Sequence, residues 1–372
     1  MTGTAIIFRS GKSSIQAVVF GNMAPHDTIF LESTSKIEKE EVARSFIDFQ
    51  IWDFPGQIDY FDDSPYNTRE IFGTVGTLVF VIDAQDDYVD ALHRLQYTIV
   101  RVYQINPEIT FEILIHKVDG LTEEHKEDVR NDIITKMYEY LIDSKQEKDI
   151  HLFYHMTTIY DNSIYEAFSK IIQKLIRELP ALEKLLDILR ANSGLEKTYL
   201  FDILTKIYIA TDSTPAEIDS YELCSDMIDV VVDIDYIYGP QSGSKPLFGS
   251  EGTPNDENII NDLNVGSVFD KQSNNHYQIS ADAAEASAPA LKAPSIIKLK
   301  NGDILYMKEI NSLLVLICMI KNDNYKKYGL LDYNLQQFID AVNELFAYSI
   351  QQRRKEKGKS LAFYGNEKGK RQ

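Results

Sequence analysis

The sequence has little cysteine and no long apolar run, and each absence narrows the class of protein. Only two cysteines occur, Cys224 and Cys318, each within an apolar stretch. This pattern does not indicate a disulfide framework or a metal site, so we expect buried free thiols in a reducing compartment. The apolar run at residues 313–320 has the length of a strand, and no run approaches a membrane span. No secretory signal or lipidation motif is found, so we expect partners to carry the protein to any membrane at which it works.

Positive charge is scarce over most of the chain. The formal net charge is −19 over 372 residues. This argues against nucleic acid as the main partner, because such binding depends on neutralising phosphates. The C-terminal end differs, since residues 351–372 contain eight Lys or Arg against two Glu. We interpret residues 352–372 as a basic disordered tail, with a weak contact to an acidic partner or an anionic membrane as the alternative.

The first half of the chain alternates strand-like and helix-like segments. The strand-like segments have apolar residues on both faces, as strands buried in a parallel sheet do. We expect strands at residues 46–52, 77–82, 111–116 and 151–156, and helices at residues 12–20, 88–103, 123–142 and 163–179. Pro180 is expected to end the last helix. This order predicts a doubly wound α/β domain at residues 1–180, with a ligand at the carboxyl ends of the strands.

The second half has a different order of elements. We expect a helix at 182–191, strands at 199–202 and 207–211, a helix that starts at residues 212–215 and runs to about 232, strands at 295–300, 304–308 and 312–320, and a helix at 334–351. Residues 239–294 are rich in small and polar residues and are interpreted as a disordered insertion. Residues 181–351 are thus predicted to be an α+β domain with a five-stranded antiparallel sheet. We find no catalytic constellation there, so packing against a partner is the expected role.

A phosphate-binding motif opens the first expected helix. It reads Ser10-Gly11-Lys12-Ser13-Ser14. Backbone N–H groups at a helix N-terminus suit anionic oxygens, Lys12 can reach β- and γ-phosphates, and the Ser13 hydroxyl can bind Mg²⁺. The alternative interpretation is a helix cap rich in Ser and Gly.

The motif lacks one of its usual residues. The full phosphate loop has a Gly five residues before Gly11, where this sequence has Ile6. An Ile at a position suited to a tight turn would strain the loop and crowd the phosphates. The N-terminal strand and the phosphate loop are therefore predicted to be incomplete, through a mistaken gene start or exon junction, or because nucleotide binding has been lost.

Two further segments have the composition of a nucleotide switch. Asp53 ends an expected strand and can face Mg²⁺ through water, and Gly56 lets a backbone N–H approach a phosphoryl oxygen. Gln57 can orient an attacking water. Thr34 lies in a polar segment and can close over Mg²⁺ and the γ-phosphate, although by itself it is a loop threonine.

The base-reading signal follows the expected strand at residues 111–116. The Asp119 carboxylate can accept the N1–H and amino hydrogens of guanine, and Lys117 can lie along the base and brace the phosphate loop. His116 replaces the usual Asn and keeps a ring nitrogen for hydrogen bonding. Thr158, after the expected strand at residues 151–156, can present its backbone N–H to the guanine carbonyl. The four elements occur in the order that guanine-nucleotide binding requires.

The chain resembles the Rag GTPases of the C/D type, including their fungal counterpart. His116 in place of Asn, and Phe54-Pro55, are features of that branch. The resemblance covers nearly the whole chain and is carried by residues 10–14, 30–34, 51–57, 81–86, 116–120 and 163–175, with 196–202, 206–213 and 221–239 in the second half.

This resemblance implies a Ras-like P-loop GTPase domain followed by a roadblock/longin-like domain. It implies GTP or GDP and Mg²⁺ as ligands, and slow hydrolysis of GTP that depends on an activating protein. Lys12 and Ser13 would bind phosphates and Mg²⁺, Thr34 and Asp53 would form the switch, and Asp119 would bind the base.

The resemblance also implies partners and a place in the cell. It implies an obligate heterodimer with an A/B-type Rag GTPase, docking on a lysosomal or vacuolar scaffold complex, and signalling of amino-acid sufficiency to the target-of-rapamycin complex. The expected location is cytoplasmic, at the lysosome or vacuole through partners, with the nucleus as a further location. The alternative is a pseudo-GTPase that serves as a structural subunit of the heterodimer.

Overall fold

The computed structural model describes most of the chain. The described residues are 2–8, 11–31, 38–42, 48–54, 69, 72–73, 75–144, 150–215, 218–238, 294–311 and 313–368. Within these ranges the backbone alone is described for residues 2–8, 12, 38–42, 48–54, 218, 235–238, 350 and 353–368. The insertion predicted at residues 239–294 lies outside the described residues except for Pro294. No helix in the described ranges is both long and apolar enough to cross a bilayer.

The N-terminal half forms a six-stranded sheet in the order β2-β3-β1-β4-β5-β6. Its strands are β1 (Thr2–Phe8), β2 (Glu38–Val42), β3 (Asp48–Phe54), β4 (Thr77–Asp83), β5 (Thr110–His116) and β6 (Leu152–Thr157). β2 pairs antiparallel with β3, and all other pairs are parallel. The predicted parallel sheet is confirmed.

Two strands of this sheet differ from the expectation. We predicted an incomplete N-terminal strand, whereas β1 is seven residues long and lies between β3 and β4. The charged edge strand β2 was missed because its sequence, Glu-Lys-Glu-Glu-Val, has no alternation of apolar and polar residues.

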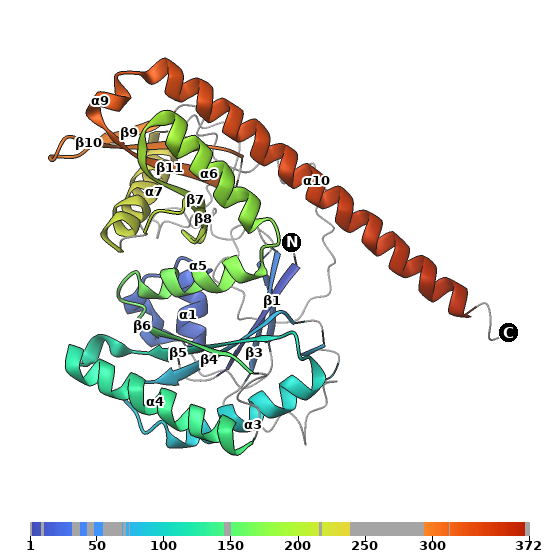
Figure 1. Cartoon of the computed structure of the whole chain (residues 1–372). Helices are drawn as coiled ribbons and strands as arrows, with labels where there is room; N and C mark the ends of the chain where they lie inside the picture. Colours follow the sequence, from blue (N-terminus) through green and yellow to red (C-terminus); the bar gives the residue numbers. More distant parts are fainter. Residues whose placement is uncertain are drawn as a thin grey trace, which may run out of the picture.

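Helices cover both faces of the sheet (Figure 1). α1 (Lys12–Val19) and α5 (Ser163–Leu175) share one apolar core, while α3 (Val89–Ile105) and α4 (Glu123–Asp143) share the core on the opposite face. The short 3₁₀ helices η1 (Pro25–Phe30) and η2 (Val118–Gly120) follow α1 and β5. Helices on both faces of a mostly parallel sheet make this half a doubly wound α/β domain, as the sequence predicted.

The C-terminal half contains the five-stranded antiparallel sheet that the sequence predicted, in the order β8-β7-β11-β10-β9. Its strands are β7 (Leu195–Asp202), β8 (Tyr208–Thr211), β9 (Ser295–Lys298), β10 (Asp303–Glu309) and β11 (Leu314–Lys321). α6 (Leu179–Ser193) and α10 (Tyr328–Lys368) pack on one face, α7 (Ile218–Tyr238) packs on the other, and α9 (Asn322–Tyr325) follows β11.

Three local predictions in this half differ from the structure. Pro180 lies in the first turn of α6 and does not end α5, because the missing N–H of proline costs nothing at a helix start. The predicted helix start at residues 212–215 precedes α7, which begins at Ile218, and the Asp212 carboxylate accepts hydrogen bonds from the N–H groups of Thr214 and of Thr198 on β7. α10 continues to Lys368 through the range predicted to be disordered, which is rich in residues of high helix propensity such as Lys, Arg and Glu.

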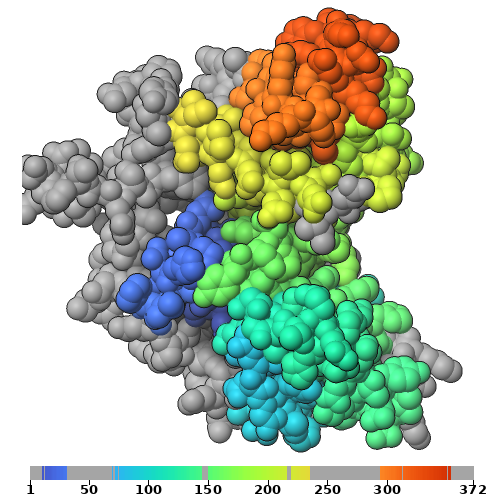
Figure 2. Space-filling view, turned by 90° about the vertical axis from the view of Figure 1, so that its left-hand side faces the viewer, coloured from blue at the N-terminus to red at the C-terminus, as the bar shows by residue number. Residues whose placement is uncertain are grey.

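The two halves are joined by polar contacts at the edge strand β8. The Tyr208 N–H donates to Ser169 Oγ over 3.1 Å, and Gln173 Nε2 donates to the Tyr208 carbonyl over 3.2 Å. α5 therefore satisfies backbone groups at the exposed edge of the second sheet. Figure 2 shows the yellow part of the second half seated on the blue and green first half, with the orange and red part above it.

Candidate nucleotide-binding site

The predicted site residues gather where three parallel strands end. Asp83 ends β4, His116 ends β5 and Thr157 ends β6. The strand register pairs Asp83 with His116, and His116 with Thr157. The carboxyl ends of parallel strands form the edge where doubly wound folds bind ligands. The structure therefore places the base-reading motif at the expected end of the sheet.

Gly11 brings the start of α1 against this edge. Its φ is +81°, a left-handed conformation that glycine adopts without steric cost. A Cβ built on Gly11 would lie 3.3 Å from His116 Cδ2 and 3.9 Å from Lys117 Cε. The glycine thus allows the backbone before α1 to approach the strand end closely, which is the property that a phosphate loop requires.

His116 is a buried bracing residue in this structure. Its side chain is 2% exposed, and Nδ1 lies 3.0 Å from Thr157 Oγ1 in a hydrogen bond. Burial, with a smaller contribution from the positive charge of Lys117, lowers the pKa of His116 to about 4, so its ring is neutral at pH 7. The ring therefore holds Gly11 and Thr157 on either side of the β5 end.

Lys117 connects the base motif to the neighbouring strand. Its φ is +62°, and its Nζ lies 2.5 Å from Asp83 Oδ2. Its carbonyl accepts a hydrogen bond of 2.7 Å from Gln85 Nε2. The side chain runs beside Gly11, as the bracing role predicted for Lys117 requires.

Sequence reasoning did not assign roles to Asp83 and Gln85. The available signal was an Asp directly after a buried apolar strand, since such a residue must lie at the ligand-binding edge of the sheet. Gln85 follows in the same turn, where its N–H donates to Asp83 Oδ1 over 3.0 Å. Both residues position Lys117.

Asp119 is held by the loop that follows β6. Thr158 Oγ1 donates to Asp119 Oδ1 over 2.6 Å, and the Tyr160 N–H donates to Thr158 Oγ1 over 3.3 Å. The Thr158 N–H, which we predicted to meet a guanine carbonyl, donates to Ser163 Oγ over 3.0 Å. A base carbonyl would share or replace that bond. The network fixes the orientation of the Asp119 carboxylate.

Several predicted residues lie partly or wholly outside the described part of the structure. Ser10, Thr34, Gly56 and Gln57 lie outside it, and for Lys12 and Asp53 only the backbone is described. Ser13 and Ser14 lie in the first turn of α1. The β1–β3 register pairs Ile7 with Asp53, so the end of β3 lies beside the strand that leads to Gly11.

Metal ligation was also predicted at this edge, through Ser13, Thr34 and Asp53. Across the residues whose side chains are described, no group of three or more His, Cys, Asp or Glu residues gathers in a way that could hold a metal ion. The predicted set does not depend on such a group, since Mg²⁺ is usually bound by one or two protein oxygens together with phosphates and water.

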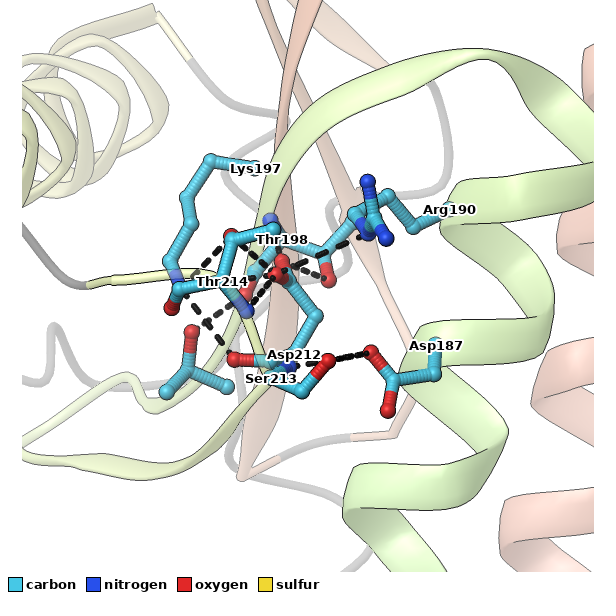
Figure 3. Close-up of polar contacts among 8 residues, drawn as sticks. Asp187, Arg190, Lys197, Thr198, Asp212, Ser213 and Thr214 are labelled. Carbon is cyan, nitrogen blue, oxygen red and sulfur yellow. Dashed lines mark hydrogen bonds and ion pairs between the residues drawn. The ribbon is translucent and has the colours of Figure 1, made fainter.

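A second polar cluster lies in the C-terminal half and joins β7, the segment after β8, and α6 (Figure 3). The buried Asp212 carboxylate accepts hydrogen bonds from the N–H and Oγ1 of Thr198, at 2.6 and 2.9 Å, and from Thr214. Lys197 Nζ donates to the Thr214 carbonyl over 2.6 Å and lies 3.5 Å from Asp212 Oδ1. Arg190 Nε is 3.7 Å from the same oxygen.

This cluster has a structural role. Burial opposes the ionised form of Asp212, but the hydrogen bonds from Thr214 and Thr198 outweigh it and hold the pKa of the carboxyl below its ordinary value. Burial lowers the pKa of Lys197. Asp212, Lys197, Thr198 and Thr214 bond to one another inside the fold, and Arg190 approaches Asp212 as an ion pair without a hydrogen bond from Nε, so the cluster fixes the segment after β8 against β7 and α6.

Comparison with known proteins identifies the family of the chain. The model of the Gtr1/RagA G protein conserved region matches residues 7–228. The chain is 46% identical over 344 residues to mouse Ras-related GTP-binding protein C, covering 92% of this chain and 76% of that protein. It is 46% identical over 339 residues to the Schizosaccharomyces pombe GTP-binding protein gtr2, covering 91% and 95% of the two chains. It is 37% identical over 342 residues to Saccharomyces cerevisiae GTR2, covering 91% and 90%. The chain therefore belongs to the Gtr/Rag family of Ras-related GTP-binding proteins, in its C/D branch.

Proposed function

We propose that this protein is the guanine-nucleotide switch subunit of a Rag heterodimer that relays amino-acid sufficiency to the target-of-rapamycin complex at the lysosome or vacuole. The observation that carries the nucleotide part is the meeting of Gly11, His116 and Lys117 at the carboxyl edge of the sheet. Residues 1–180 would be the GTPase domain and residues 181–351 a roadblock/longin-like dimerisation domain.

The residues at the edge suit a guanine nucleotide. The Asp119 carboxylate is an acceptor for the N1–H and amino hydrogens of guanine, and Thr158 holds it in place. The close approach at Gly11 leaves backbone N–H groups and the α1 N-terminus to face phosphates, a cradle that a Cβ would fill. Lys12, Ser10 and Ser14 complete this cradle in the proposal.

Hydrolysis in this proposal depends on residues beside the cradle. Ser13 and Thr34 would hold Mg²⁺ directly and Asp53 through water, and the ion would neutralise charge on the β- and γ-phosphates. Gly56 would place a backbone N–H near the γ-phosphate, and Gln57 would orient water for slow hydrolysis with an activating protein. Because the family resemblance implies activity in the GDP state, hydrolysis would switch this subunit on.

A structural subunit with impaired nucleotide binding is the second candidate, and one observation favours it. β1 runs through Ile6 to Phe8 and α1 begins at Lys12, so only Arg9, Ser10 and Gly11 connect them. In the full motif the loop begins at the Gly that Ile6 replaces. A shorter loop would surround fewer phosphate oxygens.

Nucleotide binding by the purified heterodimer separates the two candidates. We expect a fluorescent GDP analogue to bind the wild-type heterodimer and to bind a Lys12→Ala variant at least tenfold more weakly, because a phosphate-binding cation is lost. Equal affinities would contradict the switch and favour the structural subunit. The A/B-type partner carries a substitution in its own base-reading motif that prevents it from binding guanine nucleotide. The fluorescence signal then reports nucleotide bound to this chain.

Base specificity gives a second test. Asp119→Asn replaces an acceptor with an amide that can donate to the C2 carbonyl of xanthine. We expect weaker GDP binding and stronger XDP binding, with Asp128→Asn on α4 as a control that changes neither. An Asp119→Asn variant with unchanged preference for guanine would contradict the proposed role of the carboxylate.

The proposed dimerisation surface lies on α7 and β9. Leu223, Val230 and Ile234 are exposed at spacings that place them on one side of α7. β9 is the last strand of the described sheet, and its Ile297 packs into the core on the α7 face. An exposed strand edge beside an apolar helix stripe suits pairing with a similar domain, and we propose that the A/B-type Rag GTPase supplies it.

Co-purification tests this surface. We expect Val230→Asp combined with Ile234→Asp to abolish co-purification with an A/B-type partner, since buried carboxylates would lack partners. Ile188→Asp is the matched control, because Ile188 is equally exposed but lies on α6, across the sheet. Retention of the dimer by the double variant would contradict this interface. The same variants, expressed in cells, test whether docking on the scaffold complex and localisation to the lysosome or vacuole depend on the heterodimer.

A further inference from the structure

Two aromatic side chains meet beside the candidate site, and neither belongs to the predicted motifs. His26 lies on η1, and Tyr160 lies in the loop between β6 and α5. Their ring centroids are 5.7 Å apart and their planes are inclined by 45°. This contact joins two segments that are far apart in sequence.

Tyr160 is tied to the base-reading Asp119. Its N–H donates to Thr158 Oγ1, which donates in turn to Asp119 Oδ1. Directly after Tyr160, Asp161 Oδ1 accepts the Ser163 N–H over 2.8 Å and so anchors the other end of the loop to α5. The ring of Tyr160 therefore projects from a loop whose shape is set by the groups that hold the base carboxylate.

His26 is tied to the helix that starts the phosphate motif. The Met23 N–H donates to the Ala17 carbonyl over 2.9 Å, which joins the chain before η1 to α1. Within η1, the buried Thr28 Oγ1 donates to the Pro25 carbonyl over 2.8 Å. η1 ends at Phe30 and leads towards Thr34, the residue proposed to close over the γ-phosphate.

We propose that His26 and Tyr160 form an aromatic clasp that slows the release of guanine nucleotide. Through this contact, η1 is linked to Tyr160, and Tyr160 is linked through Thr158 to Asp119. The base-reading loop and the segment before Thr34 therefore hold each other in place. Both rings are partly exposed to solvent, with Tyr160 51% exposed, so the contact can open without disturbing the core. His26 and Tyr160 are positioning residues, and the inference rests on the proposed nucleotide function.

Nucleotide release from the purified heterodimer tests the clasp. A fluorescent GDP analogue is chased with excess GDP, with the partner's site blocked. We expect about threefold to tenfold faster release from Tyr160→Ala and from His26→Ala, the range that loss of an aromatic contact accounts for. Tyr160→Phe should restore the wild-type rate, because it keeps the ring. Tyr138→Ala removes an exposed tyrosine from α4 and should change nothing.

A double-mutant cycle separates the clasp from a general loss of structure. If the rings act through each other, the His26→Ala/Tyr160→Ala double variant should release nucleotide no faster than either single variant. Two outcomes would overturn the clasp but leave the proposed nucleotide function intact, provided that the wild type binds GDP normally. One is additive effects of the two substitutions on the release rate. The other is unchanged release from both single variants. Absence of GDP binding by the wild type would overturn the proposed function together with the clasp. Thermal melting of each variant shows whether it is folded.

Discussion

His116 Nδ1 and Thr157 Oγ1 lie 3.0 Å apart at the ends of two adjacent parallel strands, and both side chains are buried. The hydrogen bond links β5 to β6 below the loops that carry Asp119 and Thr158. The other side of the imidazole lies against Gly11. One side chain thus connects the phosphate motif to the base-reading loops.

Stability should depend on pH through His116. Burial lowers its pKa to about 4 in the folded protein from an ordinary value of 6.5, so between these values the unfolded chain binds the proton more readily. The contribution of the neutral ring is complete above pH 6.5 and is lost as the pH falls through 4. We expect a loss of about 2 kcal/mol between pH 7.5 and 5 that is absent from His116→Asn, measured by urea unfolding. His93→Asn, at an exposed position on α3, should keep the wild-type dependence.

Gly11→Ala should weaken nucleotide binding by more than its cost in stability explains. Both Gly11 and Gly302 have positive φ, so an alanine at either position should cost about 1 to 2 kcal/mol in unfolding free energy. Only at Gly11 would the new Cβ meet the His116 ring, whereas a Cβ on Gly302 has no atom within 4 Å. We expect at least tenfold weaker GDP binding from Gly11→Ala and no change from Gly302→Ala, by fluorescence titration. Equal nucleotide affinities in the two variants would contradict the close approach at Gly11.

Lys197→Met should destabilise the C-terminal half strongly. It would remove the nearer of the two cations beside the buried Asp212 carboxylate and leave Arg190 at 3.7 Å, and breaking a buried ion pair costs about 3 to 5 kcal/mol. Lys197→Met/Asp212→Asn should recover part of the loss, because the buried carboxylate is removed together with Lys197, and the partly exposed Arg190 keeps access to water. Lys170→Met breaks a partly exposed pair with Glu166 and should cost at most about 1 kcal/mol. Denaturant unfolding measures the unfolding free energy of all three variants. If Lys197→Met loses no more unfolding free energy than Lys170→Met, the structural role of the cluster is contradicted.

The two cysteines should not react in the folded protein. Both are free and buried, as the sequence predicted. Burial raises the pKa of Cys224 to about 12 and raises that of Cys318 further above its ordinary value, so the reactive thiolate is scarce at pH 8. We expect Ellman's reagent to detect both thiols only after denaturation. Rapid labelling of the native protein would show that one of these strands or helices opens readily.

The sequence by itself determined that an α/β domain is followed by an α+β domain, and it located most residues of the base-reading motif. Buried strands show apolar residues on both faces, and this local pattern located β4, β5 and β6 closely. Because parallel strands end at one edge, the positions of His116, Lys117 and Asp119 in sequence were enough to place them together. The resemblance carried by these residues also agreed with the C/D branch of the family.

The tertiary structure decided what depends on distant parts of the chain. Asp212 has the sequence of a helix cap, yet its carboxylate meets Thr198 on β7, because sheet register places them together. The ion pair of Asp83 with Lys117, and the contact of His26 with Tyr160, join segments that no local pattern relates. Propensity and periodicity act over a few residues, whereas these contacts are set by strand order and helix packing, so only the folded chain contains them.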